Sequence, residues 1–173
     1  MFWGNKCAFG QVGAAQRHLA KQNVAEGDIF LFFGLFAYEG VRDPHHRIFG
    51  YLTVEKVRSI GSRPRGDEAG ITPREHPHTI GEWHETNTIY LGRGAKAKRA
   101  HDVLRLTKVE SPASHWSIPQ WFREARLTYH TRRWGEGGTV QAVGRGQEFV
   151  ADIGNKPDSK RWLDEVITAI GKG

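Results

Sequence analysis

The residue types best suited to hold a phosphorylated aromatic ring stand together late in the chain, as Tyr129, His130, Arg132, Arg133 and Trp134. An arginine guanidinium offers a planar fork of donors that matches phosphate oxygens or the edge of a base. Tyrosine and tryptophan rings give surfaces on which bases stack, at ~1–3 kcal/mol per base. The same pattern also fits a packed tryptophan and tyrosine beside a solvated basic turn. We take this segment as the leading candidate for a ligand-binding cluster.

A second group of chemistry-bearing residues is His76-Pro77-His78, with His84 nearby. Residues two apart share a face of an extended segment, so both imidazoles could reach one metal ion. The spacing fixes no third ligand, however, and a closed metal site needs more than two. Hydrogen bonding to a phosphate or a base, or anchoring of the loop, fits these histidines better. The sequence therefore predicts no metal site and no cofactor.

Two glycine-containing segments complete the candidates. Around Gly146, the side chains of Arg145, Gln147 and Glu148 could pair with a base that approaches the backbone closely. A β-bulge with ordinary polar residues on the surface would give the same sequence pattern. Residues 92–97 imitate the dinucleotide-binding fingerprint but lack the helix and the distant acid that it requires. We interpret residues 92–99 instead as a basic loop that could bind an anion.

Nothing in the chain singles out a catalytic group. There is no Gly-x-Ser-x-Gly nucleophile elbow and no pair of carboxylates at a telling spacing. The groups that could do acid–base work are His76, His78, His130 and Glu148. Whether the protein is an enzyme stays open on these residues, and binding without catalysis is the favoured reading.

Bulk properties limit the class of protein. A chain of 173 residues fits one domain over residues 1–173, and a formal net charge of +6 favours polyanionic partners. The single cysteine, Cys7, excludes an intrachain disulfide and suits a reducing cytoplasm. No signal peptide is visible, and the apolar run at residues 29–36 is too short to span a bilayer. We therefore expect a cytoplasmic protein without membrane contacts; homo-oligomerisation stays open.

The elements that must position these residues follow from periodicity and turn residues. Helix formers predict a helix over residues 13–22, which ends near Asn23. Apolar or alternating runs predict strands over residues 29–36, 48–57, 87–91, 103–107, 127–130, 139–143 and 147–152. Residues 59–85 form a long irregular region, and residues 117–122 a short helix start.

An apolar stripe predicts a C-terminal helix that begins near Asp158 or Ser159 and ends at Gly171. Five to seven short strands with helices before and after them indicate an α+β protein. We expect a small, mostly antiparallel β-barrel with flanking helices.

Several short motifs follow one another in a definite order along the chain: Phe9-Gly10-Gln11, Ala14-Ala15-Gln16-Arg17-His18-Leu19, Gly27-Asp28 with its strand, His46 to Leu52, His76-Pro77-His78, Asn87-Thr88-Ile89-Tyr90, Leu104-Arg105-Leu106-Thr107, Trp116 to Phe122, Thr128-Tyr129-His130, Arg133-Trp134 and Gly146 to Val150. This ordered set resembles the third family of nucleotide modification associated domains, over nearly the whole chain. The pair of strands that starts at Gly27-Asp28 also looks like the barrels of the PUA-like superfold, which include modified-base readers. The second likeness is one of fold alone.

The resemblance implies a role around modified nucleotides in conflicts between phages and bacteria. We expect non-catalytic recognition of a nucleotide, either a modified base in nucleic acid or a free, cyclic signalling nucleotide. A nucleotide-modifying or nucleotide-hydrolysing enzyme and a protein-interaction module are the alternatives. The expected ligand-binding residues are Gln11, Gln16, His18, Phe33, His76, His78, Asn87, Tyr129, His130, Arg132, Arg133, Trp134, Arg145, Gln147 and Glu148.

Overall fold

The structure is a computed structural model that describes residues 1–64, 70–128, 134–135, 138–142 and 149–172. The chain divides into two compact units. The first unit comprises Met1–Leu31 and Tyr51–Lys96, and the second comprises Phe32–Gly50 and Ala97–Gly173. Two long strands, β3 (Ile29–Phe36) and β4 (His45–Ser59), pass through both units.

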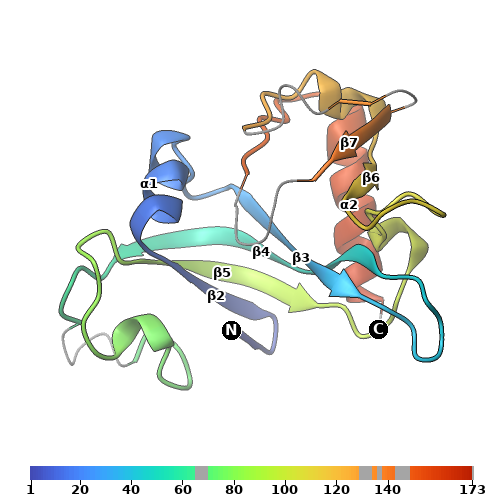
Figure 1. The fold of residues 1–173 in the computed structure, drawn as a ribbon. Helices are drawn as coiled ribbons and strands as arrows, with labels where there is room; N and C mark the ends of the chain where they lie inside the picture. The colour runs from blue at the N-terminus through green and yellow to red at the C-terminus, as the bar shows by residue number, and fades with distance from the viewer. Residues whose placement is uncertain (65–69, 129–133, 136–137, 143–148, 173) are drawn as a thin grey trace. The chain divides into compact units, whose positions relative to one another are not determined.

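One five-stranded sheet contains most of the strands, in the order β1-β2-β5-β4-β3 (Figure 1). Strands β1 (Phe2–Trp3), β2 (Lys6–Gln11) and β5 (Thr88–Lys96) pair antiparallel. The architecture is thus mixed, with two α-helices and mostly antiparallel sheets, which confirms the α+β class. Within the described residues the five strands form an open order rather than a closed barrel.

The pairing of β2 with β5 shows which side chains lie on each face of the sheet in the first unit. Gly10 pairs with Ile89, and Phe9 pairs with Tyr90. Because side chains alternate along a strand, Ala8, Gly10 and Ile89 share one face and Phe9 and Tyr90 the other. Ala8 and Ile89 are fully buried. They form a core cluster with Ile60, a buried residue of the segment between β4 and β5.

Helix α1 (Gly13–Lys21) covers the face that carries Phe9 and Tyr90, whereas the segment between β4 and β5 lies on the opposite face (Figure 1). Leu19 of α1 is buried. Asn23 has a left-handed backbone with φ 57°, so it ends the helix as the sequence predicts. The backbone N–H of Gly13, at the helix start, donates to Thr86 Oγ1 at 2.8 Å.

Residues 92–96 belong to strand β5, so their interpretation as a basic anion-binding loop is wrong. A Cβ atom at Gly92 would lie 1.9 Å from the carbonyl oxygen of Thr53, and one at Gly94 would lie 2.4 Å from that of Tyr51. These glycines therefore let the β4 backbone approach β5 closely. Glycine inside a strand often marks such a close approach of another backbone. Arg93 pairs with Glu55 at 2.9 Å.

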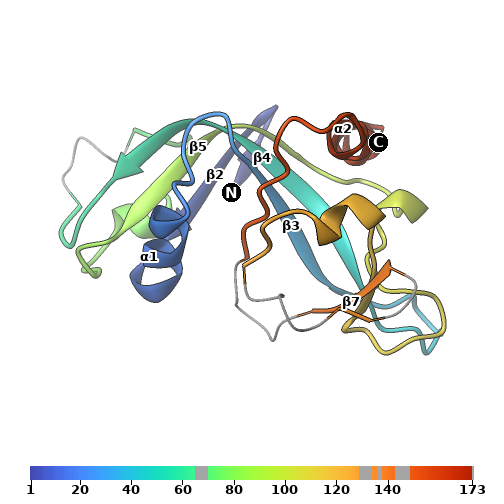
Figure 2. The ribbon, with the colours of Figure 1, turned by 90° about the horizontal axis from the view of Figure 1, so that it is seen from above.

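The second unit contains a small sheet of β6 (His115–Ser117) and β7 (Thr139–Gln141), together with helix α2 (Pro157–Gly171). Figure 2 shows α2 nearly end-on. Pro157 stands in the first turn of α2, where its missing N–H costs nothing. Val166 and Ile170 of this helix are buried, in agreement with the predicted stripe.

Three predicted strands of the second unit are not found among the described residues, and one predicted helical turn begins later than expected. Residues 102–104 form a 3₁₀ turn, η3 (Asp102–Leu104), because Leu104 N–H bonds back to His101 and Arg105 N–H to Asp102. The short helix predicted over residues 117–122 is present as the 3₁₀ turn η4 (Gln120–Arg123), but it begins only after Pro119, because Ser117 belongs to strand β6. The Thr128 N–H donates to the Val150 carbonyl at 2.9 Å, but residues 127–128 and 149–152 form no strands. Residues 129–130 and 147–148 of those two predicted strands lie outside the described residues.

Candidate functional site

The first candidate group, in the first unit, is built from His76, His78 and Asn87 around Gly10. Both imidazoles lie on the Cα of Gly10: a Cβ there would meet the His78 ring at 2.5 Å and Cε1 of His76 at 2.8 Å. The two rings are 5.4 Å apart, centroid to centroid. The turn η2 (Pro77–Thr79) carries them, and the His76 ring caps it by accepting the His78 N–H. We call His76 and His78 the histidine pair.

Hydrogen bonds fix which ring nitrogens carry protons. The Asn87 amide donates to the His78 carbonyl at 2.9 Å, so its Oδ1 faces His78 Nδ1, at 2.6 Å. His78 Nδ1 is therefore the donor, and Nε2 of the neutral ring is an acceptor. In His76 the order is reversed: Nδ1 accepts from the His78 backbone at 3.2 Å, so Nε2 carries the hydrogen. The pair presents one acceptor and one donor.

Burial makes His76 a poor proton carrier near neutral pH. Its side chain is 5 % exposed, and desolvation, with smaller effects of His78 and the N-terminal amine, lowers its pKa from 6.5 to about 4. General acid–base catalysis works best when the pKa lies near the operating pH. The position of His76 thus favours hydrogen bonding over proton transfer.

The lowered pKa of His76 predicts a loss of stability in acid. Between pH 6.5 and pH 4 the unfolded chain takes up a proton at this residue before the folded chain does, so the free energy of unfolding falls by roughly 2–3 kcal/mol, and the loss is complete below pH 4. Urea unfolding at pH 7 and pH 4.5 measures this. In His76→Asn, whose amide can keep the cap, the acid-induced loss should shrink by that amount; an equal loss in both proteins contradicts the assignment.

Other predicted residues of the first unit lie on the opposite face of the sheet. Gln16, on α1, is buried and accepts a hydrogen bond from Tyr90 Oη at 3.1 Å. Gln11 lies two residues after Phe9 on β2, so the two side chains share a face of the sheet. His18 is half-buried on α1. The sheet therefore separates Gln11 and Gln16 from the histidine pair.

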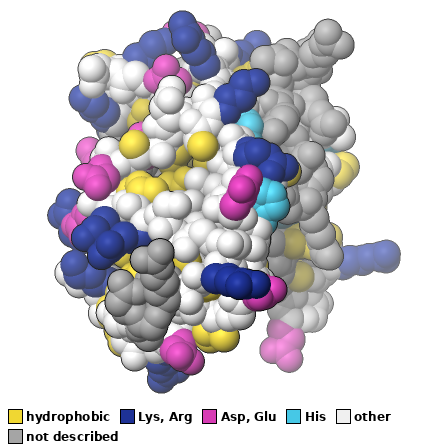
Figure 3. Space-filling model, turned by 90° about the vertical axis from the view of Figure 1, so that its left-hand side faces the viewer, with side chains coloured by type: hydrophobic (Ala, Val, Ile, Leu, Met, Phe, Trp, Pro, Cys, Tyr) yellow, Lys and Arg dark blue, Asp and Glu magenta, His cyan; other side chains and the backbone are white. Residues whose placement is uncertain are grey.

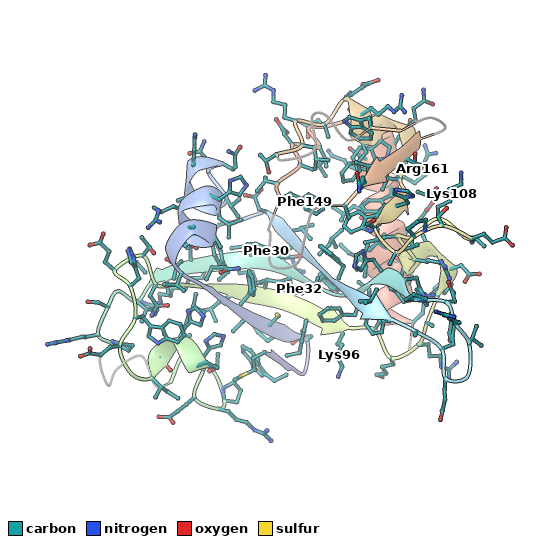
Figure 4. All side chains as sticks on the ribbon, viewed as in Figure 1. Phe30, Phe32, Lys96, Lys108, Phe149 and Arg161 are labelled. Carbon is teal, nitrogen blue, oxygen red and sulfur yellow. The ribbon has the colours of Figure 1, made fainter. Side chains whose placement is uncertain are left out.

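Phe33 belongs to the second unit, where it packs in an aromatic cluster. Its ring lies 4.9 Å from that of Trp116, in an edge-to-face arrangement, and 6.2 Å from that of Phe149, which Figure 4 labels. Trp116 is 3 % exposed and donates through Nε1 to His46 Nδ1 at 2.9 Å. Burial and the neighbouring His45 lower the pKa of His46. These contacts indicate that Phe33 packs within the aromatic cluster rather than lining a ligand site.

Trp134 borders a cleft of about 410 Å³ in the second unit, beside β6 and β7. The guanidinium of Arg123 lies 5.6 Å from the centroid of the indole ring, in a cation–π arrangement. Lys108, labelled in Figure 4, and His115 line the same cleft. The remaining described lining residues are Ser111, Gly135, Thr139, Val140 and Gln141, so no described lining residue is acidic. We call this the Trp134 cleft.

Seven of the predicted ligand-binding residues lie outside the described residues: Tyr129, His130, Arg132, Arg133, Arg145, Gln147 and Glu148. His130 and Glu148 were also candidates for acid–base work. Their roles stay predictions.

Sequence reasoning missed three contributors. Trp83 stacks on His78 at 4.3 Å with an angle of 13° between the rings, Gly10 makes room for the histidine pair, and Lys108 lines the Trp134 cleft. A large aromatic residue inside the long irregular region was the available signal for Trp83. Nothing local marks Lys108, because only the fold brings it to the cleft that Trp134 borders.

Charge on the surface is mixed where it can be seen. On the face shown in Figure 3, Lys and Arg side chains alternate with Asp and Glu among the described residues. In that described part of the chain, no three His, Cys, Asp or Glu side chains come together as a metal site. Likewise, neither described α-helix has the length and apolarity needed to cross a membrane. The net charge of +6 is therefore not gathered on that face.

Comparison with known proteins agrees with the ordered motifs. The family model described as nucleotide modification associated domain 3 matches residues 1–152. The curated proteins and the solved structures give no match. The family model covers the histidine pair, the Trp134 cleft residues and all the predicted ligand-binding residues. A match over that much of the sequence shows that the chain belongs to the nucleotide modification associated domain 3 family.

Proposed function

We propose that the protein recognises a nucleotide without chemically changing it, and that the Trp134 cleft holds this ligand. The single observation that carries the proposal is a cleft with an indole, a lysine and no described acidic side chain. A volume of about 410 Å³ lies within the usual range of small-ligand sites. Membership of a nucleotide-modification family supports a nucleotide as the ligand.

The parts of the cleft match the parts of a nucleotide. Arg123 lies over the indole of Trp134, and a base would stack on the opposite face of that ring. No ion pair joins Lys108 to any described residue, so its ammonium group can meet a phosphate. Ser111, Thr139 and Gln141 add donors and acceptors along the wall. The predicted roles of Arg132 and Arg133, next to Trp134 in sequence, extend this proposal.

Lys108→Gln should weaken the binding of nucleoside 5′-monophosphates about fivefold to tenfold in low salt, and less in high salt, because ions screen an exposed charge pair. Binding of the unphosphorylated nucleosides should not change. Isothermal titration calorimetry with both ligand series measures this, and Lys160→Gln, which removes an exposed lysine of α2, is the matched control. If no nucleotide gives heat, or if the two variants behave alike, the cleft does not bind nucleotides.

Two finer expectations belong to this proposal. The likeness to PUA-like base readers predicts that a base is held in a pocket, and the family resemblance predicts a setting of conflict between phages and bacteria. A nucleotide-bound structure tests the first. Survival of phage-infected cells with and without the protein tests the second.

A further inference from the structure

We propose that the histidine pair is a second binding site, which takes an uncharged planar ring with a hydrogen-bond acceptor beside a hydrogen-bond donor, such as the edge of a nucleobase. The site lies wholly in the first unit and is independent of the Trp134 cleft. It depends on His76 Nε2 as the donor and on His78 Nε2 as the acceptor.

Both Nε2 atoms are free to meet a ligand. Among the described residues that are not exposed, the only side-chain nitrogen or oxygen that is fully buried without a partner is Trp121 Nε1. The other bonds of the pair run through Nδ1 or the backbone. Each Nε2 therefore retains some exposure to solvent, although His76 as a whole is only 5 % exposed. An unpaired polar atom on a buried side chain would otherwise be costly to retain.

The two rings lie close together, with their centroids 5.4 Å apart. Cε1 of His76 and both Cδ2 and Cγ of His78 face Gly10, so the two rings border the same part of β2. Because the rings are neighbours, the proposed ligand ring would contact both Nε2 atoms.

The surroundings hold the pair rigidly. Asn87 is fully buried and fixes the His78 ring through its carboxamide, and Trp83 stacks on the same ring. The cap on η2 fixes His76. Rings locked by neighbouring contacts lose little entropy on binding, which is how binding sites are usually supported.

The order of donor and acceptor selects the ligand. A lactam or amidine edge of a base offers an acceptor to His76 and a donor to His78. Phosphate at pH 8 is mainly the tetrahedral dianion HPO₄²⁻, which does not match a planar edge, and two neutral imidazoles offer no charge to offset its desolvation. The site should therefore bind nucleosides and reject inorganic phosphate, which is the opposite of the preference expected from Lys108.

The test uses two matched ligand pairs at pH 8, where imidazoles are neutral. Adenosine is compared with N6,N6-dimethyladenosine, and uridine with N3-methyluridine, by NMR titration of the histidine ring signals. We expect adenosine or uridine to shift the signals of His76 and His78, and its methylated partner, which lacks the donor, to bind at least tenfold more weakly. Inorganic phosphate should shift neither signal.

Two asparagine variants separate binding from folding. The side-chain amide of asparagine can replace Nδ1 of histidine but not Nε2, so His76→Asn and His78→Asn should keep the internal hydrogen bonds and lose nucleoside binding. His78→Gln, which places a polar atom near the former Nε2, should retain part of it. His84→Asn, at an exposed neighbouring histidine, is the control and should bind normally.

Three results overturn the proposal: neither nucleoside shifts the two histidines, methylation leaves the affinity unchanged, or the asparagine variants bind as well as the wild type. These outcomes are distinct from failure of the Trp134 cleft. That site is judged by the phosphate-dependent difference between the Lys108 and Lys160 variants, which the histidine pair does not affect.

Discussion

Gly92→Ala should destabilise the protein by about 3 kcal/mol or more and lower its melting temperature by roughly 6–12 °C. The added methyl group would lie 1.9 Å from the carbonyl oxygen of Thr53 and 2.8 Å from the backbone nitrogen of Glu55. Both are backbone atoms of β4, so no side chain can rotate away to relieve the clash. The strands would have to separate where β4 and β5 meet.

Thermal and urea unfolding measure this effect. Gly94→Ala should behave similarly, since its Cβ would lie 2.4 Å from the Tyr51 carbonyl oxygen. Gly171→Ala, at the end of α2, adds a methyl group to open space and should leave stability unchanged or slightly higher. A Gly92→Ala protein as stable as the Gly171→Ala protein would show that β4 does not approach β5 in this way.

Asn87→Ala should lower the free energy of unfolding by about 2–4 kcal/mol. The side chain is fully buried, and both of its polar atoms bond to His78, at 2.6 and 2.9 Å. Removing it leaves the Nδ1–H and the carbonyl of His78 without partners and opens a small cavity. The His78 ring also loses the contact that fixes its tautomer.

The same variant should also weaken the proposed binding of nucleosides, because the His78 ring is no longer fixed. Urea unfolding gives the first quantity and NMR titration with adenosine and uridine gives the second. Asn155→Ala, at an exposed asparagine, should change neither. Unchanged stability of Asn87→Ala would mean that Asn87 does not support the histidine pair.

The strongest periodic patterns in the sequence predicted the elements well. Helix formers marked α1, the apolar run marked β3, and the stripe containing Val166 and Ile170 marked α2. These patterns are local, because a helix or a strand must bury one face at a fixed period. Strand β2 was missed, since the sequence Lys6–Gln11 mixes small and polar residues, and its pairing with β5 comes from residues more than 75 positions away.

Glycine shows why local signals can mislead. The run Gly92-Arg93-Gly94 reads as a loop, since glycine is the commonest residue of turns. Here a neighbouring strand presses on both glycines, and the chain remains extended. Only the tertiary structure distinguishes a turn glycine from a glycine packed against a neighbouring strand, because the second depends on backbone that lies 39 or 43 residues earlier in the sequence.

For the candidate sites, the sequence by itself determined the family, through the order of its motifs, and the residue types that can pair with a base. It placed His76, His78 and Asn87 in one set of ligand-binding residues, and the structure brings these three together. The sequence did not determine which nitrogen of each ring carries the proton, that the sheet separates Gln16 from the pair, or that Lys108 and Trp134 line one cleft. The tertiary structure decided these points, because proton position, sheet face and cleft lining arise from contacts between distant segments.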